Sequence, residues 1–223
     1  MNDSQQVTAV VPRAAPQAAP QDEAAITLKL LNAVEANSKL TQRGVARDLG
    51  IALGLANAYL KRCVRKGLIK VQQVPANRYA YYLTPQGFSE KSRLTAEYLT
   101  VSFNFFRRAR SDCAEVFQQC EQRGWRRLAL AGAGDLSDIA TLCANDASVE
   151  LLGVYDPDAP EGEKAGLPVR QSLQSLGAFD AIVVTALRHP QETFDSLVGR
   201  IAPDRVVTPA LLGISREPPT LME

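Results

Sequence analysis

Apolar residues recur at helical spacing in three short stretches near the N-terminal end of the chain. The first stretch ends near Asn37 and has an inner face of Ile26, Leu30, Leu31 and Val34. The second begins at Thr41, a residue type that caps helix N-termini, and ends at Gly50, which suits a left-handed stop. The third covers residues 52–66, with an apolar stripe of Ala56, Leu60, Cys63 and Val64. Two short helices joined by a glycine turn predict a helix-turn-helix.

Strand-like sequence follows these helices. Residues 68–74 and 79–83 are rich in β-branched and aromatic side chains, and residues 75–78 between them supply turn residues. The two strands therefore predict a β-hairpin, the wing of a winged helix. Thr84 and Pro85 then suit a helix cap and the first helical position.

A long apolar stripe runs from there to about Arg123. Its residues recur every three or four positions, so we expect one or two long helices, with a possible break near Ser111 and Asp112. The stripe consists of Leu94, Tyr98, Val101, Phe105, Ala109, Cys113, Val116 and Cys120. Phe103, Phe105 and Phe106 add more apolar surface than an exposed helix tolerates. Residues 88–123 are therefore predicted to form a linking helix that pairs two copies of the chain. The alternative is that the stripe packs only on its own chain.

Short apolar strands alternate with helices in the C-terminal part. Strands are expected at 128–131, 149–155, 181–185 and 205–208, with a short segment at 168–169. Helices are expected at 135–145 and 190–201, with a small one around Leu173 and Leu176. This alternation predicts a parallel sheet covered on both faces. The fold class is α/β overall: an N-terminal α+β winged helix, a long linking helix and a small Rossmann-like parallel domain.

Composition sets the outer limits of these domains. Residues 1–22 are rich in Gln, Ala and Pro without apolar periodicity, so we expect a disordered tail, and residues 216–223 form a second tail. Between the tails we expect the winged helix at 23–87, the linking helix at 88–123 and the Rossmann-like domain at 124–215. The sequence has no apolar run long enough for a membrane span and no signal-peptide pattern, so a cytoplasmic location without membrane attachment is predicted.

The formal net charge is only +1, so a DNA-binding protein of this composition must concentrate its basic residues locally. Residues 39–78 do so, with nine Lys and Arg against the single acidic residue Asp48. The second helix of a helix-turn-helix enters the DNA major groove. Base-edge and thymine-methyl contacts are predicted for Asn57, Leu53 and Ala58. Phosphate or minor-groove contacts are predicted for Arg43, Arg47, Lys61, Arg62, Arg65 and Arg78.

Residues 26–88 resemble a winged helix of the MarR-like kind. Three segments carry the resemblance: TQRGVARDLGI at 41–51, LKRCVRKGLI at 60–69 and YLTPQG at 82–87. The resemblance implies a dimeric regulator that binds double-stranded DNA, of the type associated with exopolysaccharide genes. An alternative is that this winged helix contacts proteins, because Leu53, Leu55 and Ala58 make its outer face unusually apolar.

A glycine pair follows the first C-terminal strand. Gly132 permits a tight strand-to-helix turn, and Gly134 lets backbone N–H groups approach a phosphate. Asp156 ends the next strand, where a carboxylate can bind ribose hydroxyls. Thr185 and Arg188 follow the third main strand on the same edge. Ser137 stands where the dinucleotide motif has its third glycine, and Asp135 would repel a pyrophosphate, so NAD is less favoured than other nucleotides.

Residues 126–208 resemble the Rossmann part of the sugar-nucleotide acyltransferase family or of CoA-binding domains. The segments LAGAG at 130–134, LGVYD at 152–156, GLPV at 166–169 and DAIVV at 180–184 carry it. The order of domains also resembles the Rex family, in which a winged helix precedes an NADH-sensing domain. This resemblance implies a nucleotide or sugar-nucleotide ligand. The alternative is a degenerate domain used only for assembly.

The remaining candidates concern thiols and catalysis. The four cysteines are scattered without metal-ligand spacing, so no structural zinc is expected. Cys113 and Cys120 lie seven residues apart on one helix face, which allows a redox switch across a dimer or two buried apolar residues. His189, the only histidine, precedes Pro190 and suits a helix start better than catalysis. Without Walker A, HExxH or GxSxG motifs, an enzyme with an accessory winged helix is the weaker alternative to a regulator. A co-regulator that docks on another regulator is the other alternative.

Overall fold

A computed structural model describes residues 20–74 and 78–216, and for residues 20–22 and 78 it describes the backbone only. The chain divides into two compact units, residues 1–100 and residues 101–223. Each unit has its own hydrophobic core. The predicted combination of an N-terminal winged helix-turn-helix with a parallel sheet is confirmed.

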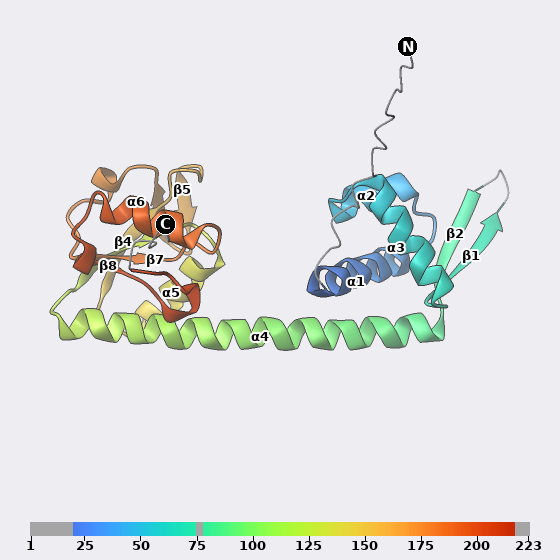
Figure 1. Ribbon diagram of the computed structural model, residues 1–223, viewed down its shortest axis with the longest axis horizontal. Coiled ribbons are helices and arrows are strands. Elements are labelled where there is room, and N and C mark those ends of the chain that lie inside the picture. Colours follow the sequence, from blue (N-terminus) through green and yellow to red (C-terminus); the bar gives the residue numbers. More distant parts are fainter. Residues whose placement is uncertain (1–19, 75–77, 217–223) are drawn as a thin grey trace, which may run out of the picture. The chain divides into compact units, whose positions relative to one another are not determined.

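The N-terminal unit contains three helices and a hairpin before the long helix begins (Figure 1). The helices are α1 (Pro20–Ala36), α2 (Gln42–Leu49) and α3 (Leu53–Arg65). Strands β1 (Ile69–Val74) and β2 (Arg78–Leu83) pair antiparallel, with Ile69 opposite Leu83 and Val74 opposite Arg78. The three helices and the hairpin enclose a core that includes Leu30, Leu31, Val34, Tyr59, Leu60, Ile69 and Tyr81.

The junction between the wing and the next helix depends on two residues. The Thr84 hydroxyl donates to the carbonyl oxygen of Gly67 at 2.6 Å and accepts from the Gly87 N–H at 3.0 Å, so Thr84 caps the following helix as predicted. A Cβ atom at Gly87 would lie 2.1 Å from the carbonyl oxygen of Leu68. Backbone cannot yield to such an approach, so position 87 requires glycine.

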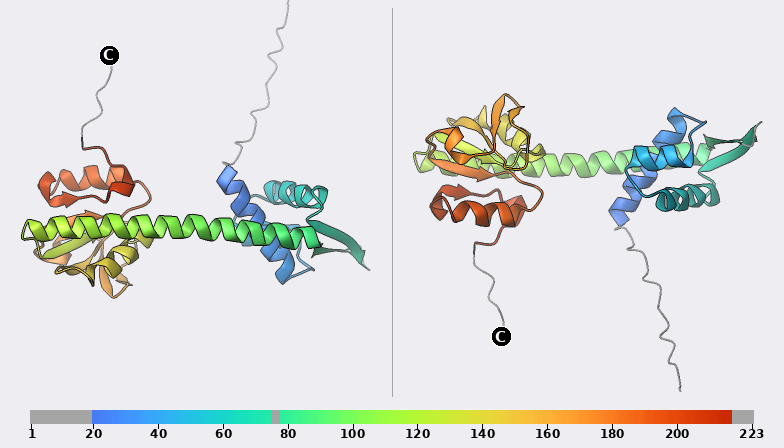
Figure 2. Two further views of the ribbon diagram at one scale, coloured as in Figure 1. Left: turned by 90° about the horizontal axis from the view of Figure 1, so that it is seen from below. Right: turned by 90° about the horizontal axis from the view of Figure 1, so that it is seen from above.

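Helix α4 (Pro85–Gln122) is continuous, and the break considered near Ser111 and Asp112 does not occur (Figures 1 and 2). Its first turns contribute Leu94 to the N-terminal core, and its last turns contribute Ala109, Cys113 and Phe117 to the C-terminal core. Within the described ranges no helix combines the length and apolarity that a membrane span needs.

The C-terminal unit is built on a six-stranded sheet with the order β5-β6-β4-β3-β7-β8. All neighbouring pairs are parallel except β5 with β6. The strands are β3 (Arg127–Ala131), β4 (Glu150–Tyr155), β5 (Gly162–Lys164), β6 (Leu167–Arg170), β7 (Ala181–Val184) and β8 (Val206–Val207). Helices α5 (Asp135–Ala144) and α6 (Pro190–Val198) and the 3-10 helices η1 (Leu173–Leu176), η2 (Pro203–Arg205) and η3 (Ala210–Leu212) connect them.

Side chains of successive strand residues enter two different cores. On β3, Leu128 and Leu130 join a core with α5 and the end of α4, whereas Ala129 and Ala131 join a core with α6 and η1. Residues 181–184 of β7 divide in the same alternating way. Since successive side chains of a strand point to opposite faces, both faces of the sheet are covered, as the sequence predicts.

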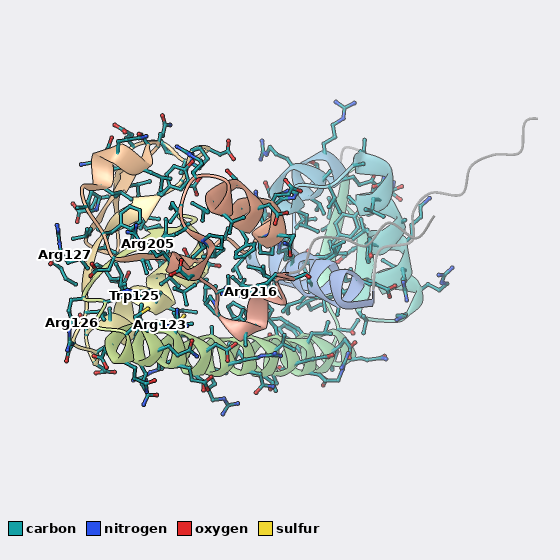
Figure 3. All side chains as sticks on the ribbon, turned by 60° about the vertical axis from the view of Figure 1, so that its left-hand side comes forward. Arg123, Trp125, Arg126, Arg127, Arg205 and Arg216 are labelled. Atoms are coloured by element: carbon teal, nitrogen blue, oxygen red, sulfur yellow. The ribbon has the colours of Figure 1, made fainter. Side chains whose placement is uncertain are left out.

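The beginnings of the parallel strands are held together by Asp180 and nearby arginines. The Asp180 carboxylate accepts the backbone N–H groups of Arg126 and Arg127, both at 2.8 Å, and these bonds lower its pKa. The Arg205 guanidinium donates to the carbonyl oxygens of Asp180 and Phe179. Figure 3 shows these three arginines in this unit with Trp125, over whose ring the Arg123 guanidinium lies at 4.9 Å. Asp180 therefore fixes the start of β3 against that of β7.

Several expected boundaries need correction. Helix α1 already begins at Pro20, inside the predicted tail 1–22, while residues 1–19 lie outside the described part. Strand β5 falls in a stretch predicted as loop, where Ala165 and Gly166 close the β5–β6 hairpin with positive φ angles of 49° and 79°. Arg216, assigned to the second tail, donates to the carbonyl oxygen of Val206 at 3.2 Å, and residues 217–223 are not described.

The thiols of Cys113 and Cys120 are fully buried in the C-terminal core. Burial raises the pKa of the Cys113 thiol to about 12 and that of the Cys120 thiol to about 11. A thiol that reacts must reach solvent and form a thiolate. The hypothesis of a redox switch between these two residues across a dimer is therefore wrong for the folded chain.

Candidate nucleic-acid interface

The turn between α2 and α3 sets the geometry of the candidate interface. The Thr41 hydroxyl oxygen accepts the N–H of Gly44 at 3.1 Å and caps the start of α2. Gly50 ends α2 with φ of +66°, and its N–H is bonded to the last turn of the helix. Only two residues separate Gly50 from the start of α3 at Leu53, so α2 and α3 have the arrangement of a helix-turn-helix.

The inner face of α3 consists of Ala56, Tyr59, Leu60 and Cys63. Tyr59 is buried on this face although the sequence pattern did not include it, and Val64, which the pattern did include, is exposed. Burial also raises the pKa of the Cys63 thiol, so this cysteine acts as a small apolar residue. The seating of α3 on its core leaves the opposite face open to solvent.

The open face of α3 combines apolar and basic side chains. Leu53, Ala58, Lys61 and Arg65 are exposed, and all four were predicted to contact DNA. Lys66, which directly follows the helix, is exposed as well, although it was not among the predicted contacts. Its position after a run of basic residues was the signal available in the sequence. Cations in the last helical turn also complement the negative C-terminal end of the helix dipole.

Asn57 is half-buried rather than fully outward. Its Oδ1 atom is buried and has no hydrogen-bond partner among the described residues. A bidentate contact with adenine needs both the Oδ1 acceptor and the Nδ2 donor of an asparagine. The side chain must therefore turn outward before it can form that contact.

Arg62 is engaged within the protein. One guanidinium nitrogen of Arg62 lies 2.5 Å from Oε1 of Glu23 on α1. Glu23 stands 39 positions earlier in the chain, so no local sequence pattern indicates this ion pair. The pair positions Arg62 toward α1 and reduces its availability to a phosphate.

The predicted contacts outside α3 lie on α2 and on the wing. Arg43 and Arg47 are both exposed on α2, and Arg47 makes only a long contact of 3.4 Å with the neighbouring Asp48. Arg78 begins β2, but its side chain lies outside the described part of the structure. The structure thus brings Arg43, Arg47, Lys61 and Arg65 onto the surface of one helix-turn-helix.

The second predicted site lies where β3 passes into α5. Gly132 has φ of +111°, and a Cβ atom there would lie 2.5 Å from the backbone nitrogen of Ala186. Gly134 precedes α5 with φ of −105°, and a Cβ atom there would meet open space. Gly132 is therefore required by the protein's own packing, whereas Gly134 leaves the start of α5 accessible.

Polar side chains around this loop bond mainly to backbone. Asp156 accepts the Ala133 N–H at 2.8 Å through Oδ2 and the Asp158 and Ala159 N–H groups through Oδ1. The buried Thr185 hydroxyl donates to the carbonyl oxygen of Gly132 at 2.8 Å. Each of these bonds fixes the loop in place, so a ribose or phosphate would have to displace or share them.

Of the other predicted ligand residues, Ser137 is bonded to backbone and Arg188 is open to solvent. The buried Ser137 hydroxyl donates to the carbonyl oxygen of Gly134 at 2.6 Å. Arg188 is exposed and makes no hydrogen bond or ion pair with any described residue. The exposed carboxylate of Asp135 occupies the first turn of α5. His189 adopts a left-handed conformation, with φ of +53°, and precedes α6, where its Nδ1 atom lies 3.1 Å from Glu192. The acidic Asp135 at the start of α5 and the engaged Ser137 hydroxyl are both unfavourable for a pyrophosphate at this loop.

Comparison with known proteins identifies part of the chain. A family model described as winged helix-turn-helix DNA-binding matches residues 24–70, which contain α2, α3 and most of α1. No curated protein of similar sequence was found. The N-terminal unit therefore contains a winged helix-turn-helix of the DNA-binding kind.

Solved structures of transcription regulators are similar to about a third of the chain. The PcaV transcriptional regulator from Streptomyces coelicolor, in complex with its natural ligand, is 25% identical with a TM-score of 0.34, over 36% of this chain and 59% of its own. MepR, a transcription regulator of the Staphylococcus aureus multidrug efflux pump MepA, gives 21% and 0.32, over 36% and 61%. The multiple antibiotic-resistance repressor (MarR) from Listeria monocytogenes gives 19% and 0.29, over 38% and 64%. The matched parts thus span less than two thirds of each of these proteins.

Proposed function

We propose that this chain is a cytoplasmic transcription regulator of MarR type that binds double-stranded DNA. The observation that carries the proposal is the winged helix-turn-helix at residues 24–70, whose exposed face presents Lys61 and Arg65 on α3 and Arg43 and Arg47 on α2. Helix α3 is of a size that the DNA major groove admits. A match to a DNA-binding family and a basic exposed face on the recognition helix support the same conclusion independently.

The proposed contacts divide into those that read sequence and those that position the protein. Leu53 and Ala58 offer apolar surface to a thymine methyl group, and Asn57 reads a base edge once its amide turns outward. The basic side chains of α2 and α3, and Arg78 on the wing, contact phosphates or the minor groove. Arg62 contributes less, because Glu23 already neutralises it.

The regulator is proposed to act as a homodimer through residues 88–123. A two-fold dimer places two recognition helices roughly 34–36 Å apart, one turn of DNA, so that a palindromic operator is bound by both. The exposed apolar side chains of α4 supply a surface for such pairing.

The C-terminal unit is proposed to be a Rossmann-like domain that senses a nucleotide-containing metabolite, such as a sugar nucleotide. Its five parallel strands lie side by side in the order β6, β4, β3, β7, β8. When these five strands are renumbered 1 to 5 along the chain, this order becomes 3-2-1-4-5. This is the order of the dinucleotide-binding fold, with the glycine loop at the end of the first strand. Gly134 and Arg188 support ligand binding, while the acidic Asp135 makes NAD the less favoured ligand.

The DNA-binding proposal is tested by measuring the affinity of the full chain for fragments of its own promoter region and for random DNA. A regulator should bind one fragment about 10³-fold more tightly than random DNA. The variant Lys61→Ala with Arg65→Ala should weaken this binding strongly. Arg127→Ala, which removes an exposed arginine from the C-terminal unit, serves as the control. Equal affinity for all fragments at every salt concentration would contradict the proposal.

Ligand sensing is tested separately by thermal unfolding with nucleotides, sugar nucleotides and CoA esters. A ligand of the folded state raises the melting temperature by mass action. Arg188→Ala should reduce that rise without changing the melting temperature of the free protein, because Arg188 has no partner among the described residues. If none of these compounds raises the melting temperature, the alternative is favoured, in which the domain serves only for assembly.

A second candidate function is a co-regulator that docks on another regulator. Leu53 and Leu55 favour it, because each exposes 41% of its surface in the first turn of α3. Exposed leucines at the start of a helix suit a protein surface as well as a thymine methyl group. This candidate gains support if the chain binds all promoter fragments with equal affinity and a second regulator protein binds the exposed leucines of α3.

A further inference from the structure

Arg62 lies at the edge of the exposed face of α3, on the side where α1 packs (Figure 1). Successive residues of a helix are turned by about 100°, so Arg62 points away from its exposed neighbour Lys61. The Arg62 side chain is 39% exposed, and one guanidinium nitrogen lies 2.5 Å from Oε1 of Glu23. The protein itself therefore holds this arginine at the border of the surface that is proposed to meet DNA.

Arg62 borders a small cleft between α1, the end of α3 and the first turns of α4. The cleft has a volume of about 130 Å³, and apolar residues and Cys63 line part of it. Its charged residues are Glu23, Arg62, Lys66, Glu90 and Arg93. Three cations and two carboxylates thus face one another across a short distance, and each carboxylate can neutralise only a part of the positive charge.

Glu90 is already bound to another arginine. Arg93 donates to both carboxylate oxygens of Glu90, through Nε and through Nη2, at 2.9 Å each. These bonds lower the pKa of the Glu90 carboxyl. The Lys66 ammonium has no ion pair with any described residue. Of the two carboxylates that line the cleft, Glu23 is therefore the one that neutralises Arg62.

Without Glu23, Arg62 would complete a band of positive charge on the last turns of α3. Lys61 and Arg65 stand four positions apart, as do Arg62 and Lys66, so the band contains two neighbouring pairs of like charges. A DNA duplex presents closely spaced phosphates to such a surface. Glu23 removes one of the four charges from this band.

We infer that Glu23 is an autoinhibitory residue, which competes with a DNA phosphate for Arg62 and lowers the affinity of the chain for DNA. This inference rests on the proposed DNA binding, for which it names a built-in limit on affinity. Carboxylates and phosphates bind a guanidinium through the same charge-assisted hydrogen bonds. A phosphate that approached Arg62 would be repelled by the Glu23 carboxylate beside it, so Arg62 must release Glu23 before it binds phosphate.

The expected effect is several-fold and independent of DNA sequence. The contribution of one phosphate contact varies as about the −0.9 power of the salt concentration, so a full contact is worth roughly eightfold at about 0.1 M salt. Removal of the Glu23 charge should therefore raise the affinity roughly three- to eightfold at this concentration. The gain should shrink at higher salt, and it should be equal for all sequences, because phosphate contacts carry no sequence information.

The test measures binding of the full chain to random-sequence duplex DNA and to the promoter fragment that binds most tightly. Glu23→Gln, which keeps the shape of the side chain, should raise both affinities by the same factor. Glu35→Gln is the matched control. It removes the same charge from α1 and also breaks an ion pair, with Lys91, but about 18 Å further along the helix. This variant should change the affinity much less.

A double variant shows whether Arg62 carries the gain. In Arg62→Ala, the further change Glu23→Gln should raise the affinity no more than Glu35→Gln does. If the ion pair only fastens α1 to α3, Glu23→Gln should lower the melting temperature and leave DNA affinity unchanged or reduced. Partial unfolding cannot imitate the expected result, because it lowers affinity.

Two results would overturn the inference and leave the proposed DNA binding intact: no gain for Glu23→Gln beyond that of Glu35→Gln, or a gain that persists without Arg62. If the wild type binds neither random DNA nor any promoter fragment, the proposed function and the inference both fail. A wild type that binds random DNA without preferring a promoter fragment contradicts the proposed regulator, whereas a gain that depends on Arg62 on that same DNA still supports the autoinhibitory role of Glu23.

Discussion

Gly132 and Gly134 stand two positions apart in one loop and meet different constraints. At Gly132 the φ angle of +111° and the approach of Ala186 both exclude a side chain, while Gly134 has ordinary φ and open space around its missing Cβ. Only the first is therefore needed for folding. Because the space beside Gly134 is open, the first backbone amides of α5 are accessible to a ligand.

The substitution Gly132→Ala should lower the free energy of unfolding by more than about 2 kcal/mol, because strain at positive φ and a backbone clash add together. Gly134→Ala, the matched control, should change it by less than about 1 kcal/mol. Urea titration of the two variants measures both values. Similar losses in the two variants would show that the loop relaxes around the methyl group added at position 132.

The buried thiols make stability depend on alkaline pH. The pKa of Cys113 is raised to about 12 in the folded chain from an ordinary value of 9.0. Above about pH 9 the unfolded chain loses this proton and the folded chain keeps it, so stability falls as the pH rises toward 12. The stabilisation of the neutral thiol is complete below about pH 9.

Between about pH 8 and pH 10.5 this effect should cost about 1–2 kcal/mol per buried thiol. The comparison is between the wild type and the double variant Cys113→Ala, Cys120→Ala, in which this part of the pH dependence should disappear. Urea unfolding at both pH values measures it. An identical pH dependence in both proteins would mean that the thiols ionise freely in the folded state.

At the scale of elements, the end of the wing and the start of α4 form one joint. Thr84 bonds to Gly67 on one side and to Gly87 on the other. Thr84→Ala should therefore lower the free energy of unfolding by about 1–2 kcal/mol, the usual cost of a lost helix cap. Thr84→Ser retains the hydroxyl and should lose much less. Thermal unfolding of both variants checks this, and equal losses would point to the Thr84 methyl group rather than its hydrogen bonds.

Local chemistry explains which elements the sequence predicts. The limits of α2 and the start of α4 follow from Thr41, Gly50 and Thr84, whose capping roles depend only on nearby backbone. Strand β5 is missed because a polar edge strand has no core face and Ala-Gly is a weak hairpin turn. The sequence could not decide between one unbroken helix and two helices over residues 88–123, because Ser111 and Asp112 lower helix propensity but do not forbid a helix.

The candidate sites depend on contacts that periodicity does not encode. The exposure of Lys61 and Arg65 is predictable, because it follows from the buried stripe of α3. The ion pair of Arg62 with Glu23 is not, and neither are the backbone bonds of Asp156. Such partners are far apart in sequence and meet only when the chain has folded.

At the scale of the whole molecule, the distribution of charge matters more than its sum. The net charge of +1 predicts no general attraction to DNA, whereas the surface of α2 and α3 is strongly basic. Affinity for DNA should therefore fall steeply with salt, in proportion to the phosphates that this surface neutralises.

Each removed phosphate contact should reduce the slope of log affinity against log salt by about 0.9. Lys61→Ala and Arg65→Ala should each show this reduction, and Arg126→Ala in the C-terminal unit should leave the slope unchanged although it alters the net charge equally. Fluorescence anisotropy over a salt series measures the slopes. If the slope fell by the same amount in all three variants, each of which removes one positive charge, the result would argue against an interface confined to α2 and α3.

The division of α4 between two cores has a consequence for how the protein is made. The N-terminal core is complete once Leu94 is available, so it can fold while the residues after 100 are still being synthesised, a delay on the order of ten seconds. We therefore expect the first turns of α4 to form before its remainder leaves the ribosome. Because starting a helix is the costly step and extending it is not, the winged helix provides the nucleus on which the rest of α4 grows.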